Sequence, residues 1–402
     1  MGWISRALLG LALTLAGGSL TARADGATAV PSGVSYELIG RWDVDKLNAV
    51  LTTEAPRFFG ITVAYAPARN AVRLYRVTYP SVVPEQGNRP IITTGLLALP
   101  DTEGTSFPLL SYQHGTVYGK KQVPSFPDQS PETELALALF AGQGYAVIGA
   151  DYFGMGASSE PEGYLVKASH QQATYDMLLA SRAVLAQMNI TTTKLFLGGW
   201  SQGGFVTMAM LQKLEEAGIT VDGAATASAP FDGYAALSGF LDFPRPNDAT
   251  WVTTLFILTA FSFENYYGVP GLARSLINDS YYDVARAAYE RKPYDPSHIP
   301  TAVKDLVRAE YFDARFFRAS AYGRILLNET QAYRWIIRSP VRNYYGEKDE
   351  VITPGLGQLA MTYQRGIGAG NMQVEAISTG PTDHRGTYAT AIPLWKAWFD
   401  GK

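Results

Sequence analysis

The sequence contains no cysteine among its 402 residues. A chain without cysteine can form no disulfide. It also cannot be anchored by a lipid attached to a cysteine at a signal-peptide cleavage site. Histidine is also scarce, with four residues in the whole chain. The sequence has no His-Glu-x-x-His motif and no clustered histidines, so we expect no metal site.

Long apolar stretches are absent as well. The apolar run from Ala7 to Leu20 is shorter than the ~20 residues that a membrane-spanning helix needs. It follows Arg6 and precedes the small-x-small pattern Ala22-Arg23-Ala24. These features predict a removable signal peptide over residues 1–24, cleaved after Ala24, and therefore a secreted or periplasmic protein without a membrane segment.

The charge balance gives no sign of a nucleic-acid partner. Removal of the two arginines of the leader changes the formal net charge from −3 to about −5. A nucleic-acid-binding protein typically carries a basic surface to neutralise phosphates. We therefore expect no nucleic-acid partner.

Short apolar runs alternate with longer helix-like segments along most of the chain. The runs that we interpret as strands are Ile91–Leu99, Leu109–Tyr112, Tyr145–Ala150, Lys194–Leu197, Gly223–Ala227, Val341–Tyr345 and Gln373–Ile377. The segments that we interpret as helices are 131–141, with Ser130 as N-cap, then 169–187, the segment after Ser201, and 388–399. This alternation predicts an α/β fold with a mostly parallel central sheet flanked by helices.

The alternation stops between residues 231 and 337. Nine of the forty residues from Trp251 to Glu290 are aromatic, about twice the 12% of the whole chain. Because this segment lies between two predicted strands, we expect a helical cap or lid inserted into a core of residues 80–230 and 338–402. Residues 25–79 would form an N-terminal extension packing on that core. The aromatic rings either bind apolar substrate groups or form the core of the cap itself.

A nucleophile motif is present in Gly199-Trp-Ser-Gln-Gly203, between a predicted strand and a predicted helix. Small residues two positions on either side of Ser201 allow the sharp turn that exposes a serine hydroxyl. The pattern predicts Ser201 as a nucleophile at a helix N-terminus. There the backbone N–H of Gln202 can face an oxygen that develops negative charge.

A serine nucleophile needs a histidine base, which a carboxylate holds in the correct tautomer. Only His384, which follows the last predicted strand, fits the chain order of serine, acid and histidine in sites of this kind. The other histidines have simpler interpretations. His114 orders the loop in which it lies, His170 falls inside a predicted helix, and His298 belongs to the predicted cap.

The carboxylate should follow the strand before His384. Asp349 comes three residues after Gly346, directly behind the predicted strand that ends at Tyr345. Its neighbours Glu347 and Glu350 remain alternatives. The order of strand, glycine and acid favours Asp349 as the third member of the triad.

Acyl transfer also requires a second donor for the oxyanion, which comes from a loop behind an earlier strand. His-Gly-Thr at 114–116 occupies that place, so Thr116, or the backbone of Gly115, is the candidate beside Gln202. The segment Asp151–Ser158 follows the next predicted strand. We expect it to form part of the pocket rim.

Together these pieces resemble the α/β-hydrolase superfamily, and more narrowly its secreted lipase and esterase branch, the secretory lipase family. The matching segments are His114–Thr116, Asp151-Tyr-x-Gly-x-Gly156, Gly199–Gly203, Ala227-Ser-Ala-Pro230, Gly346-x-x-Asp349 and His384. The resemblance covers residues 91–402 and implies a Ser201, Asp349, His384 triad, no cofactor and hydrolysis of carboxylic esters. The lack of cysteine departs from many fungal members.

The resulting prediction is an exported serine esterase or lipase that acts on a small-molecule, lipid or polyester ester and needs neither cofactor nor metal. One alternative is an exported serine peptidase of the prolyl oligopeptidase type, in which Arg or Glu residues of the cap hold a peptide terminus. Turnover of aminoacyl amides without ester preference would favour it. A second alternative is a non-catalytic protein that binds a hydrophobic ligand against the aromatic cap, and a thermal shift by ligand without turnover would favour that one.

Overall fold

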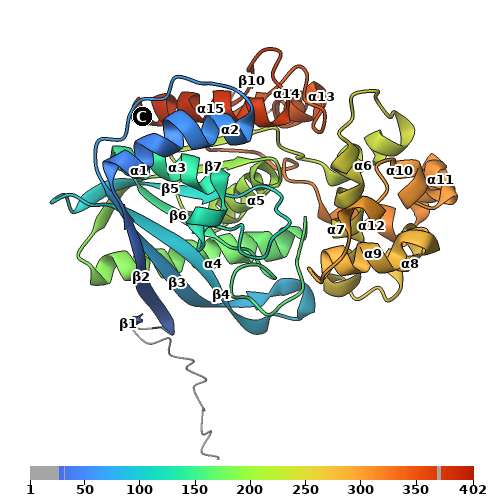
Figure 1. Cartoon of the computed structure of the whole chain (residues 1–402), viewed down its shortest axis with the longest axis horizontal. Helices are drawn as coiled ribbons and strands as arrows, with labels where there is room; N and C mark the ends of the chain where they lie inside the picture. Colours follow the sequence, from blue (N-terminus) through green and yellow to red (C-terminus); the bar gives the residue numbers. More distant parts are fainter. Residues whose placement is uncertain (1–26, 31, 369–372) are drawn as a thin grey trace, which may run out of the picture.

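The computed structural model describes residues 27–30, 32–368 and 373–402. The predicted signal peptide, residues 1–24, lies outside this part of the chain. The described residues contain a ten-stranded sheet with the strand order β1-β2-β3-β4-β6-β5-β7-β8-β9-β10 (Figure 1). The strands are β1 (Thr28–Val30), β2 (Val34–Trp42), β3 (Val72–Val83), β4 (Arg89–Pro100), β5 (Ser106–Gln113), β6 (Ala146–Ala150), β7 (Thr191–Trp200), β8 (Gly223–Ala227), β9 (Val341–Tyr345) and β10 (Val374–Ser378).

The sheet is parallel from β6 through β10, as the alternation predicted. Strands β6, β5, β7, β8, β9 and β10 pair in parallel. Neighbouring residues of β7 face opposite sides of the sheet, with Leu195 and Leu197 in one apolar core and Phe196 in the other. A strand covered on both faces reads as a continuous apolar run, which is why this part of the sheet was recognisable in the sequence.

The first four strands are antiparallel and extend one side of the sheet. β1 pairs with β2, β2 with β3, β3 with β4, and β4 with β6. Of these strands only β4 was predicted. The expected boundary between residues 79 and 80 lies inside β3, whose twelve residues pair continuously with β4. β1, β2 and the first part of β3, residues 72–79, thus belong to the central sheet.

Helices cover both faces of the sheet. The helices are α1 (Val44–Ala49), α2 (Ala55–Phe59), α3 (Pro131–Leu139), α4 (Lys167–Gln187), α5 (Gln202–Glu216), α6 (Gly233–Asp242), α7 (Thr253–Tyr266), α8 (Leu272–Leu276), α9 (Asp279–Tyr289), α10 (Val303–Leu306), α11 (Ala314–Ala319), α12 (Ala321–Glu329), α13 (Pro354–Gly357), α14 (Leu359–Gly366) and α15 (His384–Asp400). Apolar side chains of α1, α2, α3 and α15 form the core on one face, and those of α4 and α5 pack on the other. The predicted α/β class with a flanked, mostly parallel sheet is confirmed.

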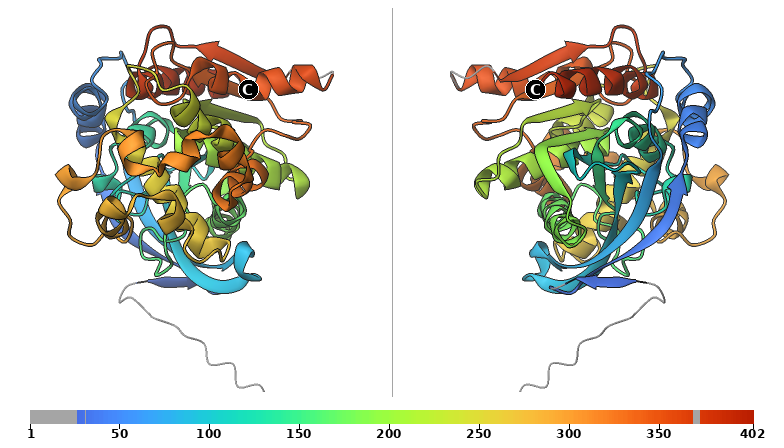
Figure 2. Two further views of the ribbon diagram at one scale, coloured as in Figure 1. Left: turned by 90° about the vertical axis from the view of Figure 1, so that its right-hand side faces the viewer. Right: turned by 90° about the vertical axis from the view of Figure 1, so that its left-hand side faces the viewer.

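Helices α6–α12, which we call the cap helices, lie between β8 and β9 in the sequence. They gather beside one end of the sheet, and the left panel of Figure 2 shows them facing the viewer in yellow and orange. Most aromatic side chains of this segment are buried among themselves, as Phe256, Phe263 and Tyr322 are. The expected helical, aromatic-rich segment is therefore present, and most of its rings form its own core.

The starts of α4 and of the last helix, and the cap of α3, differ from the sequence predictions. The last helix begins at His384, four residues earlier than expected, because the Asp383 carboxylate accepts the N–H of Gly386 and caps it there. Ser130 precedes α3 as predicted, but its hydroxyl bonds the Thr133 hydroxyl rather than a backbone N–H.

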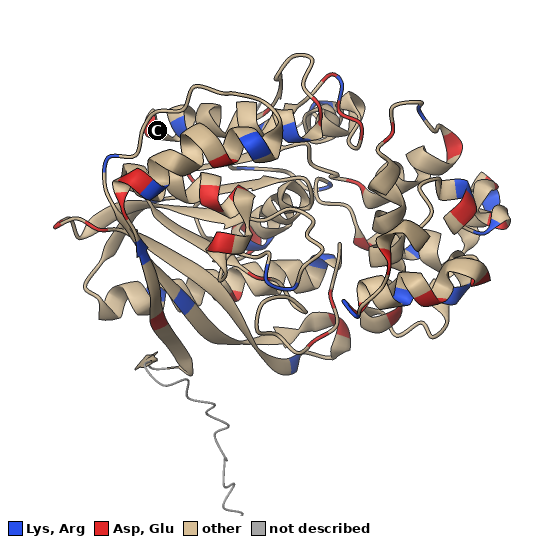
Figure 3. Ribbon diagram, viewed as in Figure 1, with Lys and Arg blue, Asp and Glu red and all other residues tan. Residues whose placement is uncertain are grey.

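The distribution of charge and the character of the helices are relevant to possible nucleic-acid and membrane partners. Basic and acidic residues are interspersed over the ribbon in Figure 3. Among the helices of the described residues, none combines the length and apolar character that a membrane span requires.

Candidate active site

Ser201 lies in a sharp turn between β7 and α5. Its φ of 56° is unfavourable for a residue with a side chain, and close backbone approaches enforce it. A Cβ on Gly203 would lie 1.9 Å from the carbonyl oxygen of Gln113, and one on Gly199 would lie 2.3 Å from that of Gly203. The two glycines therefore allow the strand and helix to approach closely enough to build the turn.

The structure brings His384 against Ser201. Its Nε2 lies 2.9 Å from Ser201 Oγ, and its Nδ1 lies 3.1 Å from each carboxylate oxygen of Asp349. All three side chains are buried. The carboxylate requires a proton on Nδ1, which leaves Nε2 free to accept the hydroxyl proton of Ser201. The indole N–H of Trp200 donates to the backbone carbonyl of His384 and fixes the start of α15.

Asp349 is held as an anion. Burial opposes its ionisation, but the neighbouring His384 and the N–H of Ile352 outweigh it and hold the pKa below its ordinary value. The alternative acids have other contacts. Glu350 accepts the backbone N–H of His384, whereas Glu347 accepts the hydroxyl of Ser378. Among the three candidates, the contacts place only Asp349 on the imidazole ring.

Gln202 is the first residue of α5, directly behind Ser201. Its backbone N–H therefore stands at the positive end of a fifteen-residue helix. The side-chain nitrogen of Gln202 lies 3.4 Å from Nε2 of His170, which is wholly buried on α4. Burial lowers the pKa of His170 to about 3, so this ring is neutral at ordinary pH.

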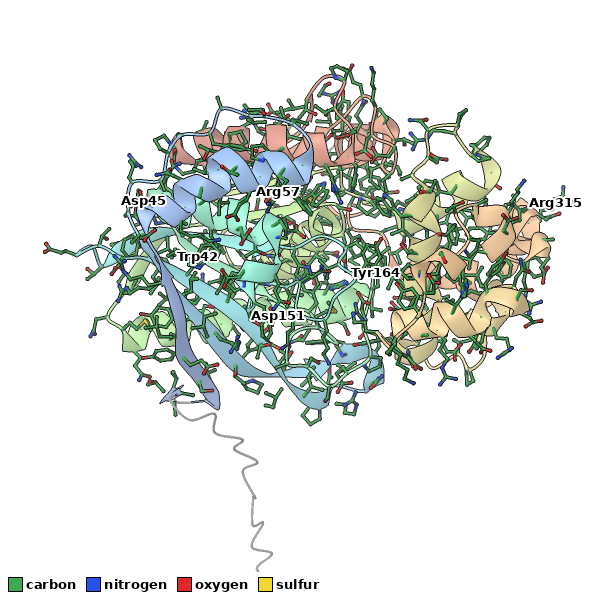
Figure 4. All side chains as sticks on the ribbon, in the orientation of Figure 1. Trp42, Asp45, Arg57, Asp151, Tyr164 and Arg315 are labelled. Atoms are coloured by element: carbon green, nitrogen blue, oxygen red, sulfur yellow. The ribbon has the colours of Figure 1, made fainter. Side chains whose placement is uncertain are left out.

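The two candidates for the second oxyanion donor, Gly115 and Thr116, have different contacts in their loop. The N–H of Gly115 already donates to both carboxylate oxygens of Glu132, at 3.0 and 2.9 Å. Thr116 lines the active-site pocket, and its hydroxyl lies 2.9 Å from that of Tyr164. Tyr164 is labelled in Figure 4, where the sheet meets the cap helices. The geometry favours Thr116, because the amide of Gly115 is engaged elsewhere.

Two further predicted residues are part of the wall behind this loop. His114 is buried, stacks on Tyr152 at 4.0 Å and places its ring nitrogens 2.9 Å from Gly115 O and 3.2 Å from Asp151 O. Burial lowers its pKa to about 4. The Asp151 carboxylate accepts the hydroxyls of Thr94 and Ser125. Neither side chain reaches the Ser201 hydroxyl through these contacts, and both brace the loop.

A pocket of about 360 Å³ opens onto Ser201. Its wall includes Thr116, Glu132, Trp200, Trp251 and His384. Trp251 comes from the cap segment, and its ring centroid lies 6.1 Å from that of His384. A larger hollow of about 470 Å³ between α6 and α13 is lined by none of the three triad candidates. The cleft at Ser201 is therefore the place where a reacting group can meet the nucleophile.

Sequence reasoning missed Glu132 and did not single out Trp251 within the aromatic segment. Glu132 follows Pro131 in the first turn of a predicted helix, where an acidic residue is commonly exposed. Here burial raises its pKa to about 7, and it also accepts the hydroxyl of Tyr112. Trp251 was one aromatic residue among nine. No local signal separates the ring at the pocket from the rings in the core of the cap.

Comparison with known proteins agrees with this architecture. The model of the prolyl oligopeptidase family matches residues 131–231, about a quarter of the chain. No match was found among the curated proteins. The rice cell wall degrading esterase LipA from Xanthomonas oryzae is similar in structure, with a TM-score of 0.73 and 20% identity over 94% of this chain and 97% of that chain.

Two further structures show the same similarity. A point mutant of that Xanthomonas oryzae esterase gives a TM-score of 0.76 at 20% identity, over 94% of this chain and 98% of that one. Lipase A from Candida antarctica in its closed state gives 0.57 at 15% identity, over 90% of this chain and 82% of that one. The chain therefore has the α/β-hydrolase fold, which is the fold that the resemblance implied.

Proposed function

We propose that the protein is an exported serine hydrolase that cleaves carboxylic esters. The observation that carries this proposal is the continuous contact from Ser201 through His384 to Asp349, in which Ser201 and His384 line an open pocket. The esterase and lipase among the structural neighbours support esters as the substrate class. Export rests on the signal peptide predicted for residues 1–24.

The geometry performs ester hydrolysis in two halves. His384 Nε2 accepts the proton of Ser201, whose oxygen attacks the carbonyl carbon of the ester. The N–H of Gln202 and the Thr116 region stabilise the oxyanion. The protonated imidazole, stabilised by Asp349, then donates its proton to the departing alcohol and leaves an acyl group on Ser201.

Water completes the reaction. It gives a proton to Nε2 of His384 and attacks the acyl carbon through the same oxyanion arrangement. The carboxylic acid departs, and the Ser201 hydroxyl is restored. The whole reaction needs only groups of the protein, one ester and one water.

The prolyl oligopeptidase match supports one alternative, a serine peptidase. That match includes β7, the Ser201 turn and α5, but ends before Asp349 and His384. A peptidase also usually needs a charged group to anchor a peptide terminus. Two charged residues of the pocket wall already have partners, because Glu350 accepts the N–H of His384 and Arg385 donates to the carbonyl of Phe58. We therefore favour esters over peptides.

The test is turnover by the purified mature protein. We expect hydrolysis of p-nitrophenyl esters, tested from acetyl to palmitoyl, and loss of this activity in Ser201→Ala. Aminoacyl p-nitroanilides serve as the amide comparison. Faster cleavage of the anilides than of the esters would favour the peptidase, and a thermal shift by a hydrophobic ligand without any turnover would favour a binding protein.

A further inference from the structure

The active-site pocket and a second hollow have one lining residue in common. Tyr118 lines the pocket at Ser201, and it also lines a narrow hollow of about 20 Å³ beside α7 and the end of α9. The residue is about half exposed, at 48%. The ring is thus the shared wall of two spaces rather than part of a packed core.

Both ends of Tyr118 are fixed. The Gln122 side-chain oxygen accepts the backbone N–H groups of Tyr118 and Gly119, at 3.1 and 2.7 Å. At the other end, the phenol oxygen lies 2.9 Å from the hydroxyl of Thr254 on α7. Thr254 donates its own proton to the Trp251 carbonyl, so Tyr118 is the donor in this contact. The ring therefore joins the oxyanion loop to the first turn of α7.

The space behind the ring is largely apolar. Its walls include Ile257 and Leu258 of α7, Ala288 of α9, and Ile299. A positive charge lies at the edge, but Arg291 is paired with the buried carboxylate of Glu162 at 2.7 Å. Such a surface suits a hydrocarbon chain and offers little to a charged group.

We infer that Tyr118 limits the length of the acyl group that the active site accepts, by closing the pocket at Ser201 against the apolar hollow beside α7 and α9. This inference rests on the proposed ester hydrolysis. Tyr118 is thus a specificity-determining residue, which restricts the binding of acyl groups of medium chain length.

The chemistry assigns the acyl group, rather than the alcohol, to this side. The departing oxygen must lie within reach of His384 Nε2, which protonates it, whereas the carbonyl oxygen faces Gln202 and the Thr116 region. Tyr118 comes two residues after Thr116, on the side of the oxyanion loop. A chain that runs from the acyl carbon away from His384 therefore meets the ring of Tyr118.

The test compares p-nitrophenyl butyrate with p-nitrophenyl decanoate. In Tyr118→Ala we expect the ratio of kcat/KM for decanoate over butyrate to rise about tenfold, because added methylenes gain apolar contacts in the transition state. Tyr118→Phe and Thr254→Val remove the hydroxyl contact but keep the ring, so they should raise the ratio by only about two- to threefold. Adding Ala288→Phe to Tyr118→Ala refills the hollow and should reverse the gain.

Controls separate a gate from general damage. Phe316 is a comparably exposed aromatic residue on α11 and lines neither space, so Phe316→Ala should leave the ratio unchanged. An equal loss for both esters in Tyr118→Ala would overturn the inference. So would a change confined to a series that varies the alcohol instead of the acyl group.

A binding readout separates this inference from the proposed function. In a Ser201→Ala background, decanoate should bind about tenfold more tightly when Tyr118→Ala is added, as measured by calorimetry. This result would support the gate even if the wild type hydrolysed no ester, an outcome that contradicts only the proposed function. Unchanged decanoate affinity, with or without ester turnover, would overturn the gate.

Discussion

Both carboxylate oxygens of Asp349 lie 3.1 Å from Nδ1 of His384. One of them, Oδ1, also accepts the backbone N–H groups of Val351 and Ile352, at 2.9 and 2.8 Å. These bonds fix the carboxylate before any substrate arrives. Asp349 therefore orients the imidazole and stabilises its charged form, whereas Glu350 reaches only the backbone of the same histidine.

Asp349→Asn should reduce kcat by about 10⁴, because an amide favours the wrong imidazole tautomer and cannot stabilise the imidazolium. The measurement is steady-state hydrolysis of p-nitrophenyl butyrate, with circular dichroism to verify folding. Glu350→Gln is the matched control. It keeps an acceptor for the His384 N–H and should lose less than about tenfold. A larger loss of kcat in Glu350→Gln than in Asp349→Asn would show that Glu350, and not Asp349, is the acid of the triad.

Gly203→Ala should abolish activity and destabilise the protein. The added methyl would lie 1.9 Å from the carbonyl oxygen of Gln113, so the turn that carries Ser201 cannot keep its shape. Gly239→Ala on α6 is the control, because no heavy atom lies within 4 Å of its added methyl. That change should stabilise the protein by about 0.5–1 kcal/mol through helix propensity. Thermal melts and ester turnover of both variants test the contrast, and an active Gly203→Ala would contradict it.

The sequence predicted the parallel part of the sheet better than the antiparallel part. β8 has the predicted bounds, because a strand buried on both faces forms a short apolar run between turns. β9 has the predicted bounds too, although it is only partly buried and contains polar residues. β2 was missed because most of its residues are half buried or exposed, so the apolar signal is weak. β3 was missed although it is well buried, since Arg73 and Arg76 interrupt its apolar pattern.

Within the site, residues that belong to a local motif were predictable and residues that meet across distant segments were not. The glycines around Ser201 predict the turn, and the order of serine, acid and histidine along the chain predicts His384 as the base. In contrast, the carboxylate of Glu132 meets the amide of Gly115 across 17 residues of sequence. Tyr118 and Thr254 lie 136 residues apart. Such contacts arise from tertiary packing and leave no periodic pattern in the sequence.

The stability of the fold should fall as the pH decreases from about 6.5. Burial lowers the pKa of His170 to about 3 and that of His114 to about 4, below the ordinary 6.5 that the unfolded chain regains. The unfolded state therefore takes up protons first, and stability present above pH 6.5 is lost as the pH falls toward the folded values. At pH 5 each histidine accounts for a loss of about 2 kcal/mol.

His170→Phe isolates this effect. The variant removes one titrating ring, so its free energy of unfolding should fall less steeply than that of the wild type between pH 7 and pH 5. Glu132 works in the opposite direction, because burial raises its pKa to about 7 and folding then favours its protonated form. That contribution is common to both proteins and cancels in the difference. His298→Gln, at an exposed position, should leave the slope as in the wild type, and equal slopes in all three proteins would contradict the prediction.

The cap helices should depend on one buried ion pair for their attachment to the rest of the fold. Arg291, just after α9, donates to Glu162 in the segment between β6 and α4 at 2.7 Å, with side chains 15% and 5% exposed. The hydroxyls of Tyr289 and Ser262 donate to the backbone carbonyl of the same glutamate. Loss of the arginine would leave Glu162 buried without its cation, and burial already raises the pKa of that carboxyl.

Arg291→Met should therefore destabilise the protein by about 3–5 kcal/mol in urea unfolding, the range for breaking one half of a buried pair. Arg286→Met is the matched control, because the side chain of Arg286 is 56% exposed. Arg286 lies in the last turn of α9 and pairs with Glu290, the residue that follows this helix. Its loss should cost less than about 1 kcal/mol. Hydrogen exchange should then quicken in α7 and α9 of Arg291→Met while the strands around Ser201 stay protected. Equal costs for the two variants, or faster exchange throughout the sheet, would show that the pair does not specifically anchor the cap helices.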